Sequence, residues 1–236
     1  MRHRTIVLPI GNRFMLRYQV VESFLSINGE GKRAGQLAVF LRFAGCNLKC
    51  SYCDTMWANQ PDVAYTWMTK EEIYEIVRQS GAKNVTITGG EPLLQKGMKE
   101  LLAFLAEDES LTIEIETNGS VDLTPYLSIS DRVVMTMDYK LPGSGMEDRM
   151  NLSNLKKLRT VDTVKFVSGS REDLIRAVQI MEEYTLRGRC ACYLSPVFGR
   201  IEPVEMVEFM KERQLTGVNL QIQMHKVIWD PEMKGV

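Results

Sequence analysis

Three of the chain's five cysteines lie within eight residues, in the stretch CNLKCSYCDT from Cys46 to Thr55. Their spacing is C-x3-C-x2-C, through Cys46, Cys50 and Cys53. Three thiolates on one short loop can each bind one iron of a [4Fe–4S] cluster, which leaves the fourth iron open to a chelating small molecule. The alternatives are a structural zinc site with a distant fourth ligand, or three buried thiols. Neither of the two histidines stands at a zinc-finger spacing from the three cysteines.

A second motif, TGGEP from Thr88 to Pro92, follows an apolar strand-like run. Gly89 and Gly90 allow the backbone at a strand end to approach a ligand closely. Glu91 is suited to accept a hydrogen bond from a cationic donor or to orient it. Taken alone, this motif is also typical of an ordinary turn.

Strand-like and helix-like runs alternate along the chain, beginning with strands at Leu16–Phe24 and Gln36–Gly45. Thr69 predicts a helix N-cap, with Glu72 completing a capping box and Gly81 ending the helix. Further strands are expected at 84–92, 111–119, 161–169, 190–199 and 217–229, together with a strand that runs into a Gly/Pro loop over 131–145. Further helices are expected at 96–107, 170–185 and 204–214, with Ser170 suited to the N-terminus of the second. Repeated β–α units imply parallel strands, whose carboxyl ends build the site. The cysteine loop and TGGEP are therefore expected on one face.

The fold class predicted by this pattern is α/β, an incomplete (β/α) barrel of about six parallel strands. An open doubly wound sheet is the competing architecture. Residues 15–236 are predicted to form a single domain. Residues 1–14 are interpreted as an N-terminal extension, either disordered or an artefact of an upstream start.

The composition narrows the partners and the compartment. Lys and Arg number 29 against 30 for Asp and Glu, so no general attraction to nucleic acid or to an anionic membrane is expected. No apolar run reaches the roughly 18 residues of a membrane span. The apolar segment Ile6–Ile10 is too short for a signal peptide. An odd number of cysteines, three of them clustered, favours reduced thiols and a cytoplasmic location.

The cysteine spacing, with the aromatic Tyr52 before the last cysteine, resembles the radical S-adenosylmethionine (SAM) superfamily, and TGGEP resembles that superfamily's GGE motif. The resemblance implies that SAM chelates the open iron of a [4Fe–4S] cluster. An electron from the reduced cluster then cleaves SAM to methionine and a 5′-deoxyadenosyl radical, which abstracts hydrogen from the substrate.

The longer stretch NGEGKRAGQLAVFLRFAGCNLKCSYCDT, from Asn28 to Thr55, closely resembles the 7-carboxy-7-deazaguanine synthases. TGGEP, TNG, KFV and LQIQMHK extend the match along the chain. The chain departs from the pattern with Asn28 for the usual Gln, Tyr52 for a common Trp, and DYKLPGSG where many members have Ser-Pro-Lys. The resemblance implies conversion of the small molecule 6-carboxytetrahydropterin into 7-carboxy-7-deazaguanine, with ring contraction and loss of ammonia, on the route to queuosine.

The resemblance also implies the cofactors and the residues of the site. The cofactors are a [4Fe–4S] cluster, SAM and Mg²⁺, with Cys46, Cys50 and Cys53 on the cluster and Thr55 on Mg²⁺. The residues expected to contact SAM are Tyr52, Cys53, Asp54, Gly89, Gly90, Glu91, Asp138, Tyr139 and Lys140. The residues expected to contact the substrate are Ile27, Asn28, Gly29, Glu30, Arg42, Thr88, Gln223 and His225.

The residue types suit these roles, and each has an ordinary alternative. Glu30 can accept two N–H bonds from a guanidine-like edge, and the planar fork of Arg42 fits a carboxylate. A solvated loop acid and a strand-end salt bridge are the structural alternatives for these two residues. Lys140 could equally be a flexible loop lysine, and His225 a solvent-facing residue at a strand end. Cys190 and Cys192 alternate by two and are interpreted as core residues.

Two other functions remain open on the sequence. A glycyl-radical-enzyme activating protein uses the same cysteine spacing but acts on a large protein partner. A non-enzymatic scaffold that binds zinc or an iron–sulfur cluster is the second alternative. For the synthase reading, the resemblance implies a homodimer and a flavodoxin-like or other electron donor.

Overall fold

Seven strands of one sheet are parallel to one another, and the cysteine loop follows the first of them. The computed structural model describes residues 16–236, so the predicted extension at residues 1–14 lies outside the described residues. The sheet has nine strands in the order β3-β1-β2-β4-β5-β6-β7-β8-β9, and pairing is parallel from β2 through to β9. The strands are β1 (Tyr18–Ile27), β2 (Leu37–Phe43), β3 (Thr66–Met68), β4 (Asn84–Gly89), β5 (Thr112–Thr117), β6 (Val133–Tyr139), β7 (Thr163–Ser168), β8 (Ala191–Pro196) and β9 (Val218–Leu220).

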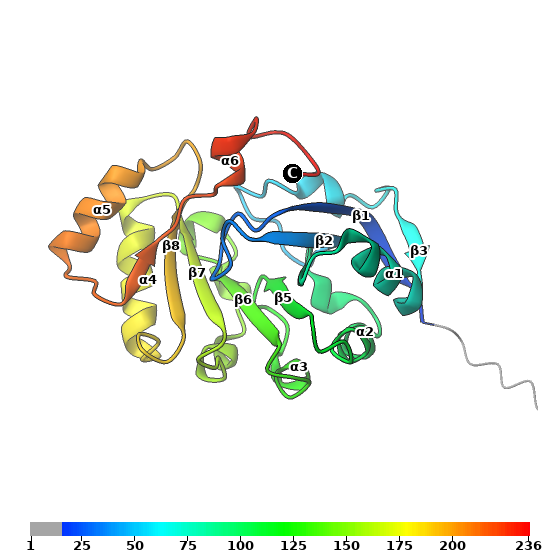
Figure 1. The fold of residues 1–236 in the computed structure, drawn as a ribbon. Coiled ribbons are helices and arrows are strands. Elements are labelled where there is room, and N and C mark those ends of the chain that lie inside the picture. The colour runs from blue at the N-terminus through cyan, green and yellow to red at the C-terminus, as the bar shows by residue number, and fades with distance from the viewer. Residues whose placement is uncertain (1–15) are drawn as a thin grey trace, which may run out of the picture.

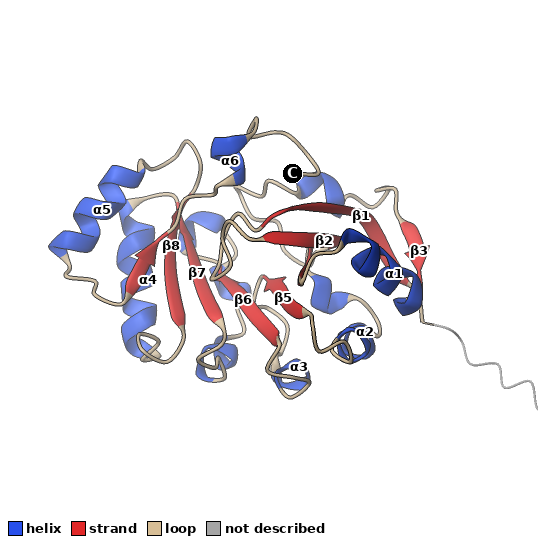
Figure 2. Ribbon diagram, viewed as in Figure 1, coloured by secondary structure: helices blue, strands red, loops and turns tan. Residues whose placement is uncertain are grey.

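Helices connect the parallel strands and cover the outer face of the curved sheet (Figures 1 and 2). The helices are α1 (Lys70–Ser80), α2 (Met98–Leu105), α3 (Thr124–Leu127), α4 (Arg171–Glu183), α5 (Pro203–Glu212) and α6 (His225–Ile228). Because β3 and β9 are edge strands that do not pair with each other, the barrel is open. The predicted incomplete (β/α) barrel is confirmed, with seven parallel strands in place of about six.

Side chains alternate along the strands between an apolar outer face and a polar inner face. In β5, Ile113 and Ile115 are fully buried in the hydrophobic core beneath the helices. The intervening Glu114 and Glu116 lie on the other face, because successive side chains of a strand point to opposite sides. Neighbouring strands continue this inner face with residues such as Thr86 and Lys165. The outer face of the sheet is therefore buried in the hydrophobic core, and the inner face carries the polar and charged side chains.

The predicted helix signals are confirmed. Thr69 Oγ1 accepts from the Glu72 backbone N–H at 3.2 Å, and the Glu72 carboxylate accepts from the Thr69 N–H at 2.7 Å. Gly81 ends α1 in the left-handed conformation at φ +70°, which glycine adopts without strain. Ser170 caps α4 by accepting from the Asp173 N–H at 3.3 Å. These local rules fix where the helices start and stop.

The N-terminal part of the sheet differs from the simple β–α pattern. β1 pairs antiparallel with both β2 and β3. The connection at 28–36 is too short to hold the crossover helix that a parallel pair requires, so β1 and β2 form a hairpin. The end of β1 therefore lies at the opposite end of the barrel from the cysteine loop, which follows β2.

The strand predicted at 217–229 is wrong beyond Leu220. β9 ends there because Gln221 turns its side-chain amide to the backbone of Gly31, with hydrogen bonds of 2.7 and 3.1 Å. The chain then crosses the inner side of the sheet and forms the short helix α6 (Figure 1). Cys190 and Cys192 are buried, which confirms their interpretation as core residues. Among residues 16–236, no helix is long and apolar enough to cross a membrane.

Candidate active site

The cysteine loop begins directly after β2 and is held by the turn after β6. The Ser51 hydroxyl donates to the Gly143 carbonyl at 2.8 Å, and the Ser51 N–H donates to the Ser144 carbonyl at 3.0 Å. Arg200 adds hydrogen bonds of 3.2 Å to the Ser51 hydroxyl and carbonyl. Two separate segments of the chain, the turn after β6 and Arg200, therefore hold the loop in place. Cys46, Cys50 and Cys53 lie on it as partly buried free thiols.

The surroundings of the thiols fit an iron–sulfur cluster. Cys46 Sγ accepts from the Leu48 N–H at 3.4 Å and from the Asn118 amide at 3.6 Å, and such donors stabilise a thiolate. Burial raises the pKa values of Cys46 and Cys50, so a bound metal would be needed to keep them deprotonated at neutral pH. Within residues 16–236, no three His, Cys, Asp or Glu side chains form a group that could hold one metal ion. A four-iron cluster does not need such a group, since each cysteine binds a different iron.

The GGE motif packs directly against the start of the cysteine loop. The Gly90 N–H donates to the Phe43 carbonyl at 3.3 Å, and the Glu91 N–H donates to the Gly45 carbonyl at 2.9 Å. A Cβ atom at Gly90 would lie 2.1 Å from Asn59 Oδ1, 2.3 Å from the Gly45 carbonyl oxygen and 2.6 Å from the Cys46 Cβ. Gly90 therefore has a steric reason to be glycine, because any side chain would press on the first cysteine.

Glu91 is fully buried and ties this motif to the end of β5. Its carboxylate accepts from the Asn118 N–H at 2.7 Å, the Leu93 N–H at 3.0 Å and the Thr117 hydroxyl at 3.0 Å. Burial raises the pKa of Glu91 to about 7, although these hydrogen bonds favour the ionised form. Its side chain thus fixes the shape of the loop, and the backbone of the motif is left to face a ligand.

The segment Asp138–Lys140 places two of its three side chains beside the cysteine loop. Lys140 Nζ lies 2.8 Å from Asp138 Oδ2, while Asp138 Oδ1 is buried without a hydrogen-bond partner. The charge of Lys140 lowers the Cys50 pKa and that of Asp138 raises it, although burial is the larger influence. Tyr139 instead points into the core, where it packs on Phe166 and donates to Glu147 at 2.9 Å. Of this predicted segment, Tyr139 can therefore offer only its backbone to a ligand.

The loop after β1 lies deep in the barrel and brings Glu30 against β7 and β8. Glu30 Oε2 lies 2.8 Å from Lys165 Nζ, and Glu30 Oε1 accepts from the Ser195 hydroxyl at 3.0 Å. Burial acts to raise the Glu30 pKa, but the charge and hydrogen bond of Lys165 outweigh it and lower that pKa below its usual value. The pair is almost fully buried, with 8 % of the Glu30 side chain and 9 % of the Lys165 side chain exposed.

Three other predicted substrate residues lie at the end of β1 and at the start of the loop that carries Glu30. Asn28 is buried; its Oδ1 accepts from the Thr86 hydroxyl at 2.7 Å, and its Nδ2 has no partner. Ile27 ends β1 opposite Leu37, and Gly29 lies against the His225 ring, where a Cβ would meet Nδ1 at 2.6 Å.

The remaining predicted residues lie on β2, β4 and the cysteine loop. Arg42 forms an ion pair of 2.7 Å with Glu22 of β1, which matches the structural alternative named for it. Thr88 donates to Glu116 at 2.8 Å. Thr55 Oγ1 lies 3.7 Å from Cys53 Sγ, at the edge of the expected cluster.

The C-terminal segment joins the two ends of the site. Asp54, beside the last cysteine, forms an ion pair of 3.6 Å with Lys226. The Met224 N–H donates to the Gly29 carbonyl at 3.3 Å, which places His225 over the loop that carries Glu30. Burial lowers the pKa of His225, with the charges of Glu30 and Asp54 acting in the opposite direction. Gln223 is half-buried, and its carbonyl accepts from the Lys226 N–H.

Known proteins resemble this chain over nearly its whole length. The model of the Radical SAM superfamily matches residues 41–134. A 7-carboxy-7-deazaguanine synthase from Clostridium acetobutylicum is 55% identical over 221 residues, which cover 94% of this chain and 100% of that protein. The chain belongs to the 7-carboxy-7-deazaguanine synthase family. The resemblance predicted from the motifs is confirmed.

Two further comparisons agree with membership of the 7-carboxy-7-deazaguanine synthase family. A member from Leptospira interrogans is 35% identical over 244 residues, covering 94% of this chain and 99% of that protein. The crystal structure of QueE from Escherichia coli superimposes with a TM-score of 0.71 at 22% identity, covering 89% of this chain and 95% of that one. At 22% identity, this structural similarity supports the fold alone. Nothing in these comparisons favours a glycyl-radical activating protein or a scaffold.

Four polar residues of this synthase's inner face were not predicted from its sequence. They are Glu116, Lys165, Ser195 and Gln221. For Glu116 and Lys165 the signal was present, because each is a charged residue at an alternate position of an otherwise apolar strand. Gln221 and Gln223 share a strand-like spacing, and only the three-dimensional structure shows that Gln221 is the one that binds Gly31.

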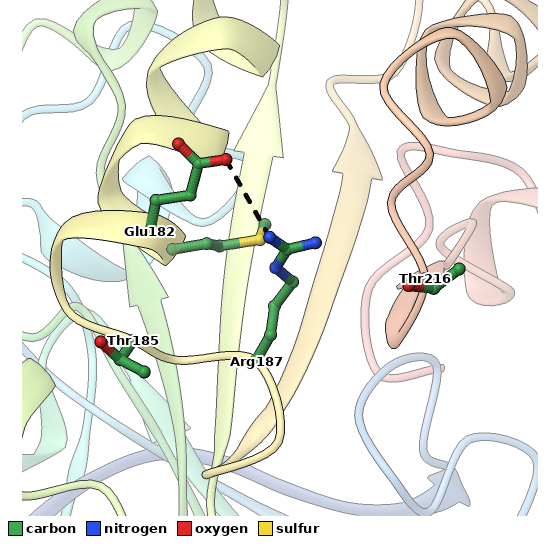
Figure 3. A pocket seen from close by; sticks show the side chains of 5 residues that line it. Glu182, Thr185, Arg187 and Thr216 are labelled. Carbon is green, nitrogen blue, oxygen red and sulfur yellow. Dashed lines mark ion pairs between the residues drawn. The ribbon is translucent and has the colours of Figure 1, made fainter.

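Figure 3 shows the side chains that line a surface hollow of about 470 Å³. It is lined by Met181, Glu182, Thr185, Arg187 and Thr216, and the Glu182–Arg187 ion pair spans 4.0 Å. These residues lie in the last turn of α4 or in the loops that precede β8 and β9, so the hollow is at the amino ends of the strands. None of the residues predicted for the synthase reaction lines it.

Proposed function

We propose that this chain converts 6-carboxytetrahydropterin into 7-carboxy-7-deazaguanine, with ring contraction and loss of ammonia, as a radical SAM enzyme of queuosine and 7-deazapurine biosynthesis. This proposal rests on a row of charged groups that runs from the loop after β1, at residues 28–36, to the cysteine loop. Glu30 contacts Lys165, Lys165 is the register neighbour of Asp138, and Asp138 contacts Lys140 beside Cys50. A polar substrate in the barrel would therefore meet both its binding groups and the cofactors.

Cys46, Cys50 and Cys53 would hold the [4Fe–4S] cluster. When bound, the reduced cluster and SAM supply the radical that abstracts hydrogen from the substrate. The unpartnered Asp138 Oδ1 offers a buried acceptor for a hydroxyl or ammonium group of SAM, while Lys140 holds the other oxygen of that carboxylate. Gly89 and Gly90 present backbone to SAM, and Glu91 fixes that backbone. Tyr52, Cys53, Asp54 and Tyr139 complete the proposed SAM-binding set, Tyr139 through its backbone.

The deeper groups would bind the pterin. Glu30, held ionised, can accept two N–H bonds from the 2-aminopyrimidinone edge. Arg42 can exchange part of its pairing with Glu22 for the substrate carboxylate, since its five donors exceed what one carboxylate takes. Thr88 and His225 flank the space between these two groups. Ile27, Asn28, Gly29 and Gln223 complete the proposed set of substrate contacts.

Thr55 is the proposed Mg²⁺ ligand, with substrate oxygens and water filling the other positions, as this cation prefers oxygen ligands. We also propose a flavodoxin-like or other low-potential electron donor, a homodimer, and a cytoplasmic location, where the thiols stay reduced. Sedimentation of the cluster-loaded protein would test the homodimer directly.

The decisive experiment is anaerobic reconstitution of the cluster followed by incubation with SAM, Mg²⁺, a reductant and 6-carboxytetrahydropterin. Mass spectrometry should detect 7-carboxy-7-deazaguanine in excess of the SAM consumed, because SAM is expected to be reused. The Cys50→Ser variant is the matched control and should yield no product. If the wild-type enzyme cleaves SAM but forms no product from this pterin, the proposed substrate is wrong while the radical SAM chemistry stands.

A further inference from the structure

Lys165 and Glu30 form a buried ion pair in the interior of the barrel, and the pair needs a physical reason. Their side chains come from residues 135 positions apart and meet at 2.8 Å with under a tenth of either side chain exposed. Buried ion pairs are weak contributors to stability, because the cost of desolvating both charges offsets most of their attraction. A buried pair among residues proposed to bind the substrate is therefore a candidate for a role in binding.

The pair leaves the Glu30 carboxylate free to accept further hydrogen bonds. Lys165 occupies one lone-pair direction of Oε2, and Ser195 approaches Oε1 at 3.0 Å. The Ser195 hydroxyl also lies 2.7 Å from the Gln221 carbonyl, and its single proton can serve only one of these two acceptors. Since a carboxylate has about four lone-pair sites, at least two remain for a ligand.

We propose that Lys165 is a positioning residue that acts through Glu30, keeping this buried carboxylate ionised and oriented so that it can accept both N–H groups of the 2-aminopyrimidinone edge of the substrate. This inference rests on the proposed function. The physical reason is that a protonated Glu30 would present one acceptor and one donor, and the donor would face the donors of the substrate. Without a cation nearby, burial alone drives a carboxyl group towards its neutral form.

The other titratable groups around the pair cannot replace Lys165. His225, above Glu30, is largely neutral at pH 7 because burial lowers its pKa. Asp138 on β6 and Glu116 on β5 face Lys165 and raise its pKa, together with Glu30, so the lysine stays charged despite its burial. Lys165 is thus the cation that contacts Glu30 in the described part of the chain, and removing it leaves a cluster of carboxylates.

The test measures binding of 6-carboxytetrahydropterin to the cluster-loaded enzyme with Mg²⁺ and without reductant, so that no turnover occurs. Lys165→Met should weaken binding at pH 6 by about tenfold or more, and binding should recover as the pH rises, by up to about tenfold per unit. The wild type and Lys165→Arg should lack this recovery, because both keep a cation beside Glu30. In the double variant Glu30→Gln/Lys165→Met the pH dependence should vanish, and the loss should not exceed that of Glu30→Gln alone.

A purely structural role for the pair predicts different results. In that case Lys165→Met would lower the melting temperature but give the wild-type pH profile of binding, and the effects of the two single variants would add. Either result would overturn the proposal. The iron content and cluster absorbance of each variant show whether the site remains folded. If Lys165→Met does not fold, Lys165→Arg provides the measurement. A wild-type pH profile of binding in Lys165→Arg supports the role of charge, and loss of that profile contradicts it. If the wild type itself fails to bind this pterin, the proposed function fails first, and the two failures are distinguishable.

Discussion

Replacing Gly90 with alanine should destabilise the cysteine loop before any cofactor binds. The new Cβ would lie 2.1 Å from Asn59 Oδ1, 2.3 Å from the Gly45 carbonyl oxygen and 2.6 Å from the Cys46 Cβ, whereas carbon atoms in ordinary contact are about 3.5 Å apart or more. The contact with Cys46 alone must therefore open by about 0.9 Å, and the backbone oxygen of Gly45 must move away as well. Gly90 cannot simply retreat, since its own N–H and that of Glu91 are hydrogen-bonded to Phe43 and Gly45. Overpacking of this kind costs about 1–3 kcal/mol.

For a chain of this size, each kcal/mol lowers the melting temperature by about 2–4 °C, so Gly90→Ala should lose about 2–12 °C. Calorimetry of the metal-free protein measures this loss, and iron analysis after reconstitution should show fewer irons per chain. Gly169→Ala is the matched control near the same loop, because its Cβ would meet nothing closer than 3.4 Å. Full iron loading and an unchanged melting temperature in Gly90→Ala would refute the steric argument.

Three further predictions concern single residues. Thr69→Ala removes the N-cap of α1 and should cost about 1 kcal/mol of unfolding free energy in chemical denaturation, with no change in cluster absorbance; a neutral result would mean that the capping box contributes nothing. Thr55→Ala should weaken the Mg²⁺ dependence of turnover while leaving the cluster spectrum intact, and loss of the cluster would contradict its assignment to Mg²⁺. His225 has a folded-state pKa below its unfolded value, so protonation favours unfolding and stability falls as the pH drops through about 6.5. The melting temperature of His225→Gln should therefore fall less steeply between pH 7 and pH 5 than that of the wild type, and parallel curves would argue against the shift.

Local sequence rules predict much of this fold. The capping box at Thr69, the left-handed Gly81 and the Ser170 cap all depend on residues within a few positions of one another, so the sequence contains the whole cause. The order of parallel strands follows from the helical crossovers between them. The β1–β2 hairpin could have been recognised from its short connection, which leaves no room for a helix.

The candidate site was predictable where a motif lies on one loop and not where distant segments meet. Cys46, Cys50 and Cys53 are close in sequence, and so they are close in space. The partner of Glu30 is a different case: the position of Lys165 within an apolar strand marks it as an inner-face residue, but nothing in the sequence pairs it with Glu30, which lies 135 positions away. The end of β9 was mispredicted for the same reason: the hydrogen bonds that divert Gln221 are made to Gly31, at the other end of the chain.

The contact between Gln221 and Gly31 has a consequence for how the enzyme is made. It joins residues 190 positions apart, and contacts of such long range form late, after the loops between them have closed. During synthesis on the ribosome, the loop at 28–36 is made early, but Gln221 emerges only after all the later strands of the sheet. A chain interrupted just before Gln221 would contain the cysteine loop and all nine strands of the described sheet, yet the loop at 28–36 would lack the two hydrogen bonds that Gln221 makes to Gly31.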